Sequence, residues 1–136
     1  MLAQKAKTNL FVAKYCYIEG KKGETSYFSV STSRAYYAAF QAAIAFFEES
    51  NFLEKGDYND GEVSIRHKKM HEKIKDFLKE RNASKKDYES ASVKYNALRQ
   101  QRIIADYYRD NISEKSAWEN IKEAENIINI LRKYVP

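Results

Sequence analysis

Residues 35–47, AYYAAFQAAIAFF, form an apolar run in which Gln41 is the one polar residue. A helix that crosses a bilayer needs about 20 apolar residues, so a run that stops at Glu48 and Glu49 is too short to span one. A helix that is apolar on nearly all sides must instead be buried in protein. We therefore expect this segment to be the central helix of a bundle, with no membrane association.

The near absence of chain-breaking residues favours an all-α fold. The chain has four glycines and one proline, and the proline is the last residue, Pro136. A length of 136 residues fits one domain, residues 1–136, with a core of its own. The lone Cys16 excludes an internal disulfide, and the start MLAQKAKTNL lacks a signal-type apolar stretch, so we expect a cytoplasmic protein.

Helical periodicity predicts five helices, arranged as an antiparallel bundle of four to five helices. We expect them at residues 2–18, 27–50, 65–82 and 85–109, and from an N-cap at Ser113 to the end of the chain. Gly20 is expected to end the first helix. The last helix carries one apolar stripe, made of Trp118, Ile121, Ala124, Ile128 and Leu131.

The helix at 27–50 separates into distinct faces at about 100° per residue. Its bulky side consists of Tyr36, Tyr37, Phe40, Ile44 and Phe47, and its flat side of Ala35, Ala38, Ala42 and Ala45. The flat side would let another helix approach closely. Arg34, Gln41 and Glu48 form the only polar line along this helix, which we expect to face a polar seam shared with a neighbour.

The helix at 85–109 has two contact faces. One stripe contains an arginine where an apolar residue is expected, and its members are Tyr88, Ala91, Tyr95, Leu98, Arg102 and Ala105. The opposite side carries Val93, Ala97, Ile104 and Tyr107. We expect one face to join the core and the face with Arg102 to meet a second subunit or a ligand. The alternative is an Arg102–Asp106 pair at i, i+4 on a solvated face.

Two motifs, S-R-A-Y-Y-A-x-F at 33–40 and R-x-x-A-D-Y at 102–107, stand in this order with His71, Ile74 and Phe77 between them, and a helix rich in Glu and Ala closes the chain. Over residues 8–132 this pattern resembles the HEPN domain family. The resemblance implies a small helical bundle, usually a homodimer, in prokaryotic toxin-antitoxin or antiviral defence systems. Its implied partners are a nucleotidyltransferase antitoxin or a larger defence effector, and RNA or a nucleotide.

Many HEPN members are metal-independent ribonucleases whose signature is an arginine followed four to six residues later by a histidine. Carried over here, the arginine is Arg102, but residues 105–109, ADYYR, contain no histidine. Cleavage through a 2′-hydroxyl needs a base, an acid and cations for the phosphorane charge. The remaining candidates beside Arg102 are Asp106, Tyr107, Tyr108 and, from another helix, His71.

Those candidates leave the enzymatic question open. A carboxylate paired with Arg102 would be held ionised and weakly basic, and a tyrosine with a reference pKa near 10 is a poor base at neutral pH. The chain could therefore be an RNA-cleaving toxin or a non-catalytic module that dimerises and holds a partner protein. The alternative to a catalytic role for His71 is a structural one, as a partly buried histidine packed near the central helix.

The first motif suggests structural or interface roles for Ser33, Arg34, Tyr37 and Gln41. Arg34 could bond backbone carbonyls or Asp106 and so join the two motif helices. His67 and His71 have the spacing of a helical metal pair, but no second pair or cysteine cluster completes a zinc set. We expect no metal and no cofactor.

The basic residues are concentrated in one segment. Residues 62–86 hold nine Lys and Arg against four Asp and Glu, and so account for the whole net charge of +5. Such a segment could track a phosphate backbone through Arg66, Lys68, Lys69 and Lys73. The alternative is an ordinary lysine-rich, solvated helix face.

Overall fold

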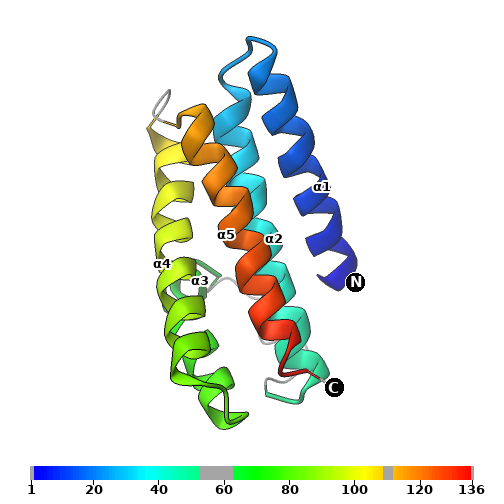
Figure 1. Cartoon of the computed structure of the whole chain (residues 1–136), viewed down its shortest axis with the longest axis vertical. Helices are drawn as coiled ribbons and strands as arrows, with labels where there is room; N and C mark the ends of the chain where they lie inside the picture. Colours follow the sequence, from blue (N-terminus) through cyan, green and yellow to red (C-terminus); the bar gives the residue numbers. More distant parts are fainter. Residues whose placement is uncertain (1, 53–62, 109–111, 136) are drawn as a thin grey trace.

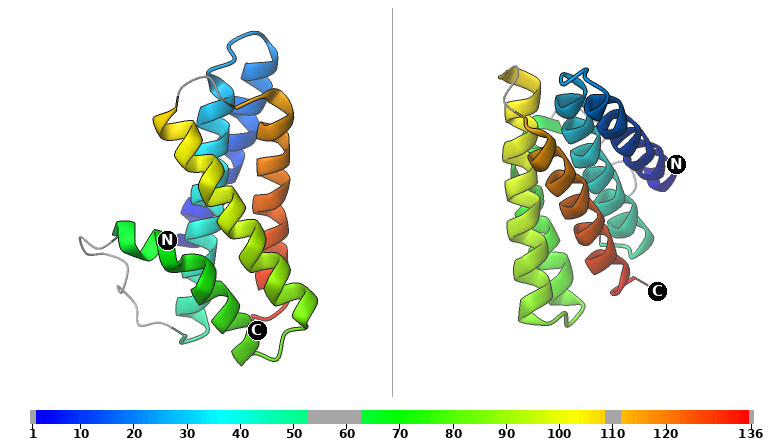
Figure 2. Two further views of the ribbon diagram at one scale, coloured as in Figure 1. Left: turned by 90° about the vertical axis from the view of Figure 1, so that its left-hand side faces the viewer. Right: turned by 45° about the horizontal axis from the view of Figure 1, so that its top comes forward.

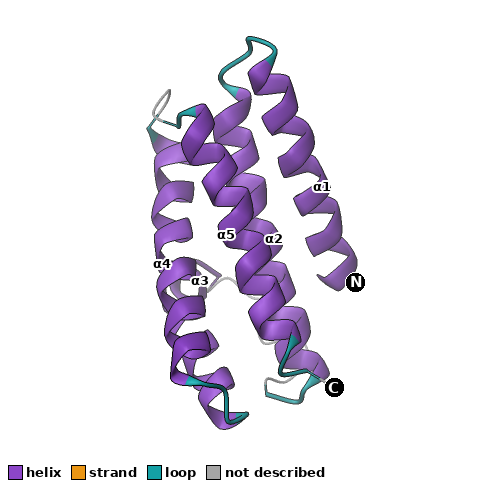
Figure 3. Ribbon diagram, in the orientation of Figure 1, coloured by secondary structure: helices purple, strands orange, loops and turns teal. Residues whose placement is uncertain are grey.

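The structure, a computed structural model, describes residues 2–52, 63–108 and 112–135, and this part of the chain contains five helices and no strand. The helices are α1 (Leu2–Lys21), α2 (Tyr27–Glu49), α3 (Val63–Glu80), α4 (Lys85–Tyr107) and α5 (Glu114–Arg132). Along the long axis of the bundle α1 and α4 run opposite to α2 and α5, whereas the neighbours α2 and α5 run parallel, so the predicted antiparallel arrangement holds only in part (Figure 1, Figure 3). The all-α prediction is confirmed.

Helix α2 is the centre of the bundle and contacts each of the other four helices. In Figure 1, α5 lies in front of α2, with α1 and α4 on its two sides. Figure 2 shows α3 crossing beside the lower part of α4, with its first turn extending away from the bundle axis. This arrangement confirms the prediction drawn from the apolar run at 35–47.

Small and large side chains divide the burial of α2 between them. The residues of α2 with at most 5% exposure are Phe28, Ser31, Thr32, Ala35, Tyr36, Ala38, Ala39, Ala42, Ala43, Ile44 and Phe47. The alanines keep one side of α2 flat, so that neighbouring helices pack close to its backbone. The larger residues fill the space on the other side, where Phe47 meets the ring of Phe77 from α3 at 4.9 Å between centroids. The other four helices can therefore all pack against α2.

The first helix does not end before Gly20, as the sequence pattern predicted, but continues to Lys21. A Cβ atom added to Gly20 would lie 2.5 Å from the Phe28 ring, so the missing side chain provides space for α2 to pack against the end of α1. The chain turns at Gly23 instead, whose φ of +125° is disfavoured for residues with a side chain. Gly20 is a packing residue, and Gly23 is the turn residue.

The other helix ends differ from their predicted positions by no more than two residues, except that α5 ends at Arg132, four residues before the end of the chain. Helix α3 ends at Glu80, because Asn82 adopts a left-handed conformation with φ of 61°. Ser113 is the N-cap of α5, as predicted, and its Oγ accepts a hydrogen bond from the Ser116 backbone N–H at 3.1 Å. Helix α4 ends at Tyr107.

Four of the five residues in the predicted apolar stripe of α5 are buried. Trp118 is the exception, with 43% exposure, and lies at the edge of the bundle, where its ring is 5.3 Å from that of Tyr17 on α1. Cys16 is buried, and burial raises the pKa of its thiol, as fits a core position. None of the described helices has the combination of length and hydropathy that a bilayer crossing requires.

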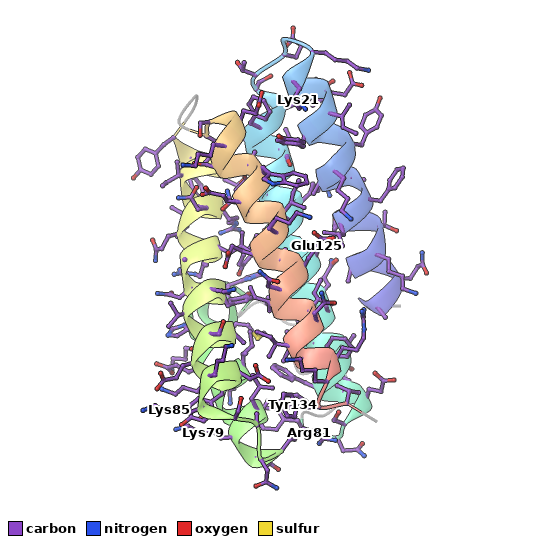
Figure 4. The ribbon with its side chains drawn as sticks, in the orientation of Figure 1. Lys21, Lys79, Arg81, Lys85, Glu125 and Tyr134 are labelled. Carbon is purple, nitrogen blue, oxygen red and sulfur yellow. The ribbon has the colours of Figure 1, made fainter. Side chains whose placement is uncertain are left out.

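The segment after α5 is fastened to the α3–α4 connection. Tyr134 donates its hydroxyl to Asp87 Oδ2 at 2.6 Å, and its carbonyl accepts from Arg81 Nε. The Tyr134 hydrogen bond, together with Lys133, keeps the pKa of Asp87 below its ordinary value. Arg81 and Tyr134 lie together at the lower end of the molecule in Figure 4.

Candidate functional site

A polar groove follows the first half of α2, with α1 on one side and α4 on the other. It consists of two hollows that share Arg34. The first is lined by Ser29, Val30, Ser33, Arg34, Tyr37, Ala105 and Asp106, and the second by Gln4, Lys5, Thr8, Asn9, Arg34 and Gln41. We call the two together the α2 groove. It brings the motif residues Ser33, Arg34, Tyr37 and Gln41 to one surface with Asp106.

Arg102 lies at the α4 side of this groove, with its side chain only 17% exposed. Its Nη2 donates to the Tyr37 hydroxyl at 2.7 Å, and its Nε is 3.0 Å from Asp106 Oδ2 without the geometry of a hydrogen bond. The guanidinium also lies over the rings of Tyr36 and Tyr37, at 5.5 and 5.4 Å from their centroids. Burial alone would lower the pKa of Arg102, but the Tyr37 hydrogen bond and the Asp106 charge raise it.

The stripe that contains Arg102 therefore packs inside the chain, where Ala91, Tyr95 and Leu98 of the same stripe are buried. The prediction that this stripe faces a second subunit is wrong for those residues. The Arg102–Asp106 pair does form, as the alternative predicted, but against two tyrosines and not on a solvated face. The face of α4 that stays open carries Val93 and Tyr107, with 67% and 70% exposure.

Arg34 has a different environment from the predicted one. Its side chain is exposed, and its Nη1 donates to Asn9 Oδ1 at 3.2 Å, while Asn9 Nδ2 donates to Gln41 Oε1 at 2.7 Å. The polar seam predicted for Arg34 and Gln41 thus exists, and its partner is Asn9 of α1. Asp106, the other predicted partner, is paired with Arg102. Arg34 therefore keeps donor capacity that faces the groove.

Sequence reasoning did not include His67 among the candidate site residues, yet His67 lies beside the Arg102 tyrosines. It is 6% exposed, its ring stacks on Phe40 at 3.8 Å between centroids, and its Nδ1 is 2.6 Å from the Tyr36 hydroxyl. Tyr95 donates to the Tyr36 oxygen at 3.0 Å, which leaves the single Tyr36 proton for His67 Nδ1. Nδ1 is then the acceptor, and the neutral ring carries its proton on Nε2.

Burial and nearby charges keep this cluster neutral apart from the arginines. Burial is the first cause that lowers the pKa of His67 to about 4, and the charges of Arg102 and Arg99 act in the same direction. Burial also raises the pKa of Tyr36 to about 12, although its hydrogen bond with Tyr95 acts against the shift. At neutral pH, His67 is a neutral, weakly basic acceptor that is already occupied by Tyr36.

The structure does not bring His71 to Arg102. Its backbone carbonyl accepts from Ser92 Oγ at 3.1 Å, and Ser92 precedes Arg102 on α4 by ten residues, or about 15 Å of helix. The His71 side chain is half-buried, in line with its structural interpretation. The sequence signal for His67 is its place on the buried stripe of α3, which continues through Met70, Ile74 and Phe77.

The remaining candidates lie outside the Arg102 cluster. Tyr107 and Tyr108 are exposed at the end of α4. Of the predicted phosphate-binding residues, Lys69 and Lys73 are exposed on α3, while the side chains of Arg66 and Lys68 lie outside the described residues. Two further lysines of the basic segment cover the Tyr88 ring of α4, with Lys75 at 5.9 Å and Lys79 at 5.1 Å from its centroid.

Comparison of the chain with models of protein families, with curated proteins and with solved structures found no match. The resemblance to HEPN domains rests on the two motifs and on their order along the chain.

Proposed function

We propose that this chain is a HEPN-like module of a toxin-antitoxin or defence system, in the cytoplasm, and that its α2 groove binds phosphate groups of RNA or a nucleotide. The observation that carries this proposal is the exposed guanidinium of Arg34 in a groove that also presents Ser33 and the Tyr37 hydroxyl. A planar guanidinium donates two parallel hydrogen bonds to a phosphate, and hydroxyl groups complete the remaining oxygens.

The charges along the groove favour one part of it. Asp106 would repel a phosphate, but Arg102 neutralises it at 3.0 Å, so this pair contributes little net charge. Lys5 and Arg34 line the second hollow, whose other lining residues Gln4, Thr8, Asn9 and Gln41 are uncharged. A phosphate would therefore bind at Arg34, on the side of the groove that faces α1.

Binding without cleavage is the better supported version. General base catalysis of 2′-hydroxyl attack works best with a group whose pKa lies near neutrality. His67, with a pKa of about 4, is buried and accepts from Tyr36, and Asp106 is paired with Arg102. An endoribonuclease would need one of these groups to be released when RNA binds.

A titration of fluorescently labelled single-stranded RNA at about 50 and 200 mM salt tests the proposal, since phosphate contacts weaken steeply with salt. Arg34→Gln keeps a donor for Asn9 while removing the charge, and we expect it to weaken binding about fivefold or more. Lys115→Gln, at an exposed position of α5, is the matched control and should bind like the wild type. Salt-insensitive binding, or equal affinity in Arg34→Gln, would contradict a phosphate site in this groove.

A gel assay with the same RNA, without metal ions, separates binding from cleavage. We expect intact RNA with the wild-type protein. Cleavage that Arg102→Ala abolishes would instead favour the metal-independent endoribonuclease.

The open face of α4 supports a second candidate, a module that holds a partner. Val93 and Tyr107 are large apolar residues with most of their surface exposed, as a contact site for a second copy, a nucleotidyltransferase or an effector requires. Light scattering at high micromolar concentration tests the homodimer, and Val93→Glu should convert a dimer to a monomer. A monomeric wild type would leave only a contact with another protein.

A further inference from the structure

A small apolar cavity lies between the first half of α1, the second half of α2 and the last turns of α5. Its volume is about 180 Å³, and its apolar wall includes Ala6, Ala42, Phe46 and Ile128. Ala6, Ala42 and Ile128 form a hydrophobic cluster separate from the main core, with Phe46 packed against it. None of the residues of the α2 groove lines this cavity, so it is a distinct site.

The size of the cavity sets the size of what it can contain. An apolar cavity of about 150 Å³ in another protein stays dry and takes up a benzene molecule. The present cavity could therefore accommodate a phenyl ring or a short branched alkyl group. Water would gain few hydrogen bonds from walls of alanine, phenylalanine and isoleucine side chains, so an apolar group is the better occupant.

The charged side chains at the edge of the cavity indicate which polar group a ligand would need beside its apolar part. Helices α1 and α5 run antiparallel, and Lys14 of α1 pairs with Glu125 of α5 at 3.0 Å. Seven residues along each helix, toward the cavity, the corresponding positions are Lys7 and Arg132, and both line it. Along the contact between α1 and α5, an ion pair at one level is thus followed by two like charges at the next, and these repel each other.

Neither of these two cations has an acidic partner among the residues that the structure describes. Arg132 makes a single 3.5 Å contact with Asn129 Oδ1, one turn earlier on its own helix. Among the described residues that line the cavity there is no carboxylate. An anion between Lys7 and Arg132 would replace their repulsion with two charge-assisted hydrogen bonds.

We propose that this cavity binds a small amphipathic monocarboxylate. Its phenyl-sized or short alkyl body would fill the space next to Ala42 and Phe46, and its carboxylate would lie between Lys7 and Arg132. Apolar walls with a small number of polar groups at one end are the usual composition of a ligand site.

Phenylacetate is a suitable probe, and phenylacetamide has nearly the same shape without the charge. Binding to the full chain is measured by chemical-shift titration or calorimetry. We expect phenylacetate to bind about tenfold more tightly than phenylacetamide, which is what two partly exposed ion pairs provide. Lys7→Gln with Arg132→Gln should remove this preference and leave the affinity for phenylacetamide unchanged.

Two further variants control for charge and for the cavity itself. Lys21→Gln with Lys115→Gln removes two positive charges from the same two helices, outside both the cavity lining and the α2 groove, and should keep the preference. Ala42→Leu should fill the cavity and abolish binding of both probes, and circular dichroism checks that it folds. Equal affinity of the wild type for the two probes, or no saturation by phenylacetate at millimolar concentrations, would overturn the proposal.

Discussion

Acidification should destabilise the protein through His67 at a pH where most other side chains do not titrate. The folded protein holds this imidazole neutral, since it is stacked on Phe40, accepts from Tyr36 and lies near the charges of Arg99 and Arg102. The unfolded chain protonates it with an ordinary pKa of 6.5. Below that pH the unfolded state binds more protons, so the free energy of unfolding falls as pH falls.

The two pKa values set the size and the range of this effect. The decrease in the pKa of His67 from 6.5 to about 4 on folding corresponds to a loss of about 3 kcal/mol in the free energy of unfolding. This full loss is reached only when the pH is below the folded-state pKa. Between pH 8 and 5.5 the expected loss is about 1.4 kcal/mol. The part of the free energy of unfolding that depends on neutral His67 is fully present above about pH 7.5. It decreases as the pH falls through the interval between the two pKa values.

Urea unfolding at pH 8, 6.5 and 5.5 measures this loss. His67→Gln should be less stable than the wild type at pH 8 because it loses the stacking on Phe40, but its stability should hardly change down to pH 5.5. His71→Gln is the matched control, because it removes the only other histidine and should keep the wild-type pH dependence. An equal pH dependence in wild type and His67→Gln would refute the argument, and so would its disappearance in His71→Gln.

Four further substitutions probe contacts described above, each by urea unfolding at pH 8. Arg102→Ala should lower the free energy of unfolding by about 2 kcal/mol, because it leaves the Tyr37 hydroxyl and the Asp106 carboxylate without their partner. Arg34→Ala should cost less, and a larger loss for Arg34 would show that its bond to Asn9 has been underestimated. Gly20→Ala should cost about 1–3 kcal/mol, because the added methyl group collides with a buried ring, and an unchanged midpoint would contradict that close contact. Lys7→Glu should stabilise the protein by a few tenths of a kcal/mol, since it places an acid opposite the basic end of α5, and a loss of stability would argue against the repulsion described there.

The central position of α2 was predictable because it depends on composition alone. A run of thirteen residues with a single polar member has little that can face water, and none of the other four helices that the structure describes contains such a run. The N-cap at Ser113 was predictable for a similar reason, because a hydroxyl residue before a helical stripe acts through local backbone geometry. Such features need no knowledge of distant contacts.

The site residues could not be placed in this way, because their environments come from other helices. The pattern of α4 shows that a stripe contains Arg102, but not which of two faces turns inward. The acceptor role of His67 depends on Tyr36, which is 31 residues away along the chain. In the sequence alone, Gly20 looks like a residue that ends a helix. Only the position of the Phe28 ring shows that Gly20 instead allows α1 and α2 to approach closely.

The location of α2 also has a consequence for how the chain unfolds. Helices α1, α3, α4 and α5 all contact α2. The packing of each of them therefore depends on the buried surface of the same helix. Removing any one would expose apolar surface of α2, whose residues 35–47 include a single polar side chain, Gln41. Partial opening is therefore costly everywhere except at the tips, and the amide protons of α2 should exchange with solvent only when the whole molecule opens. The bundle would behave as a single cooperative unit, without a smaller piece that could persist by itself.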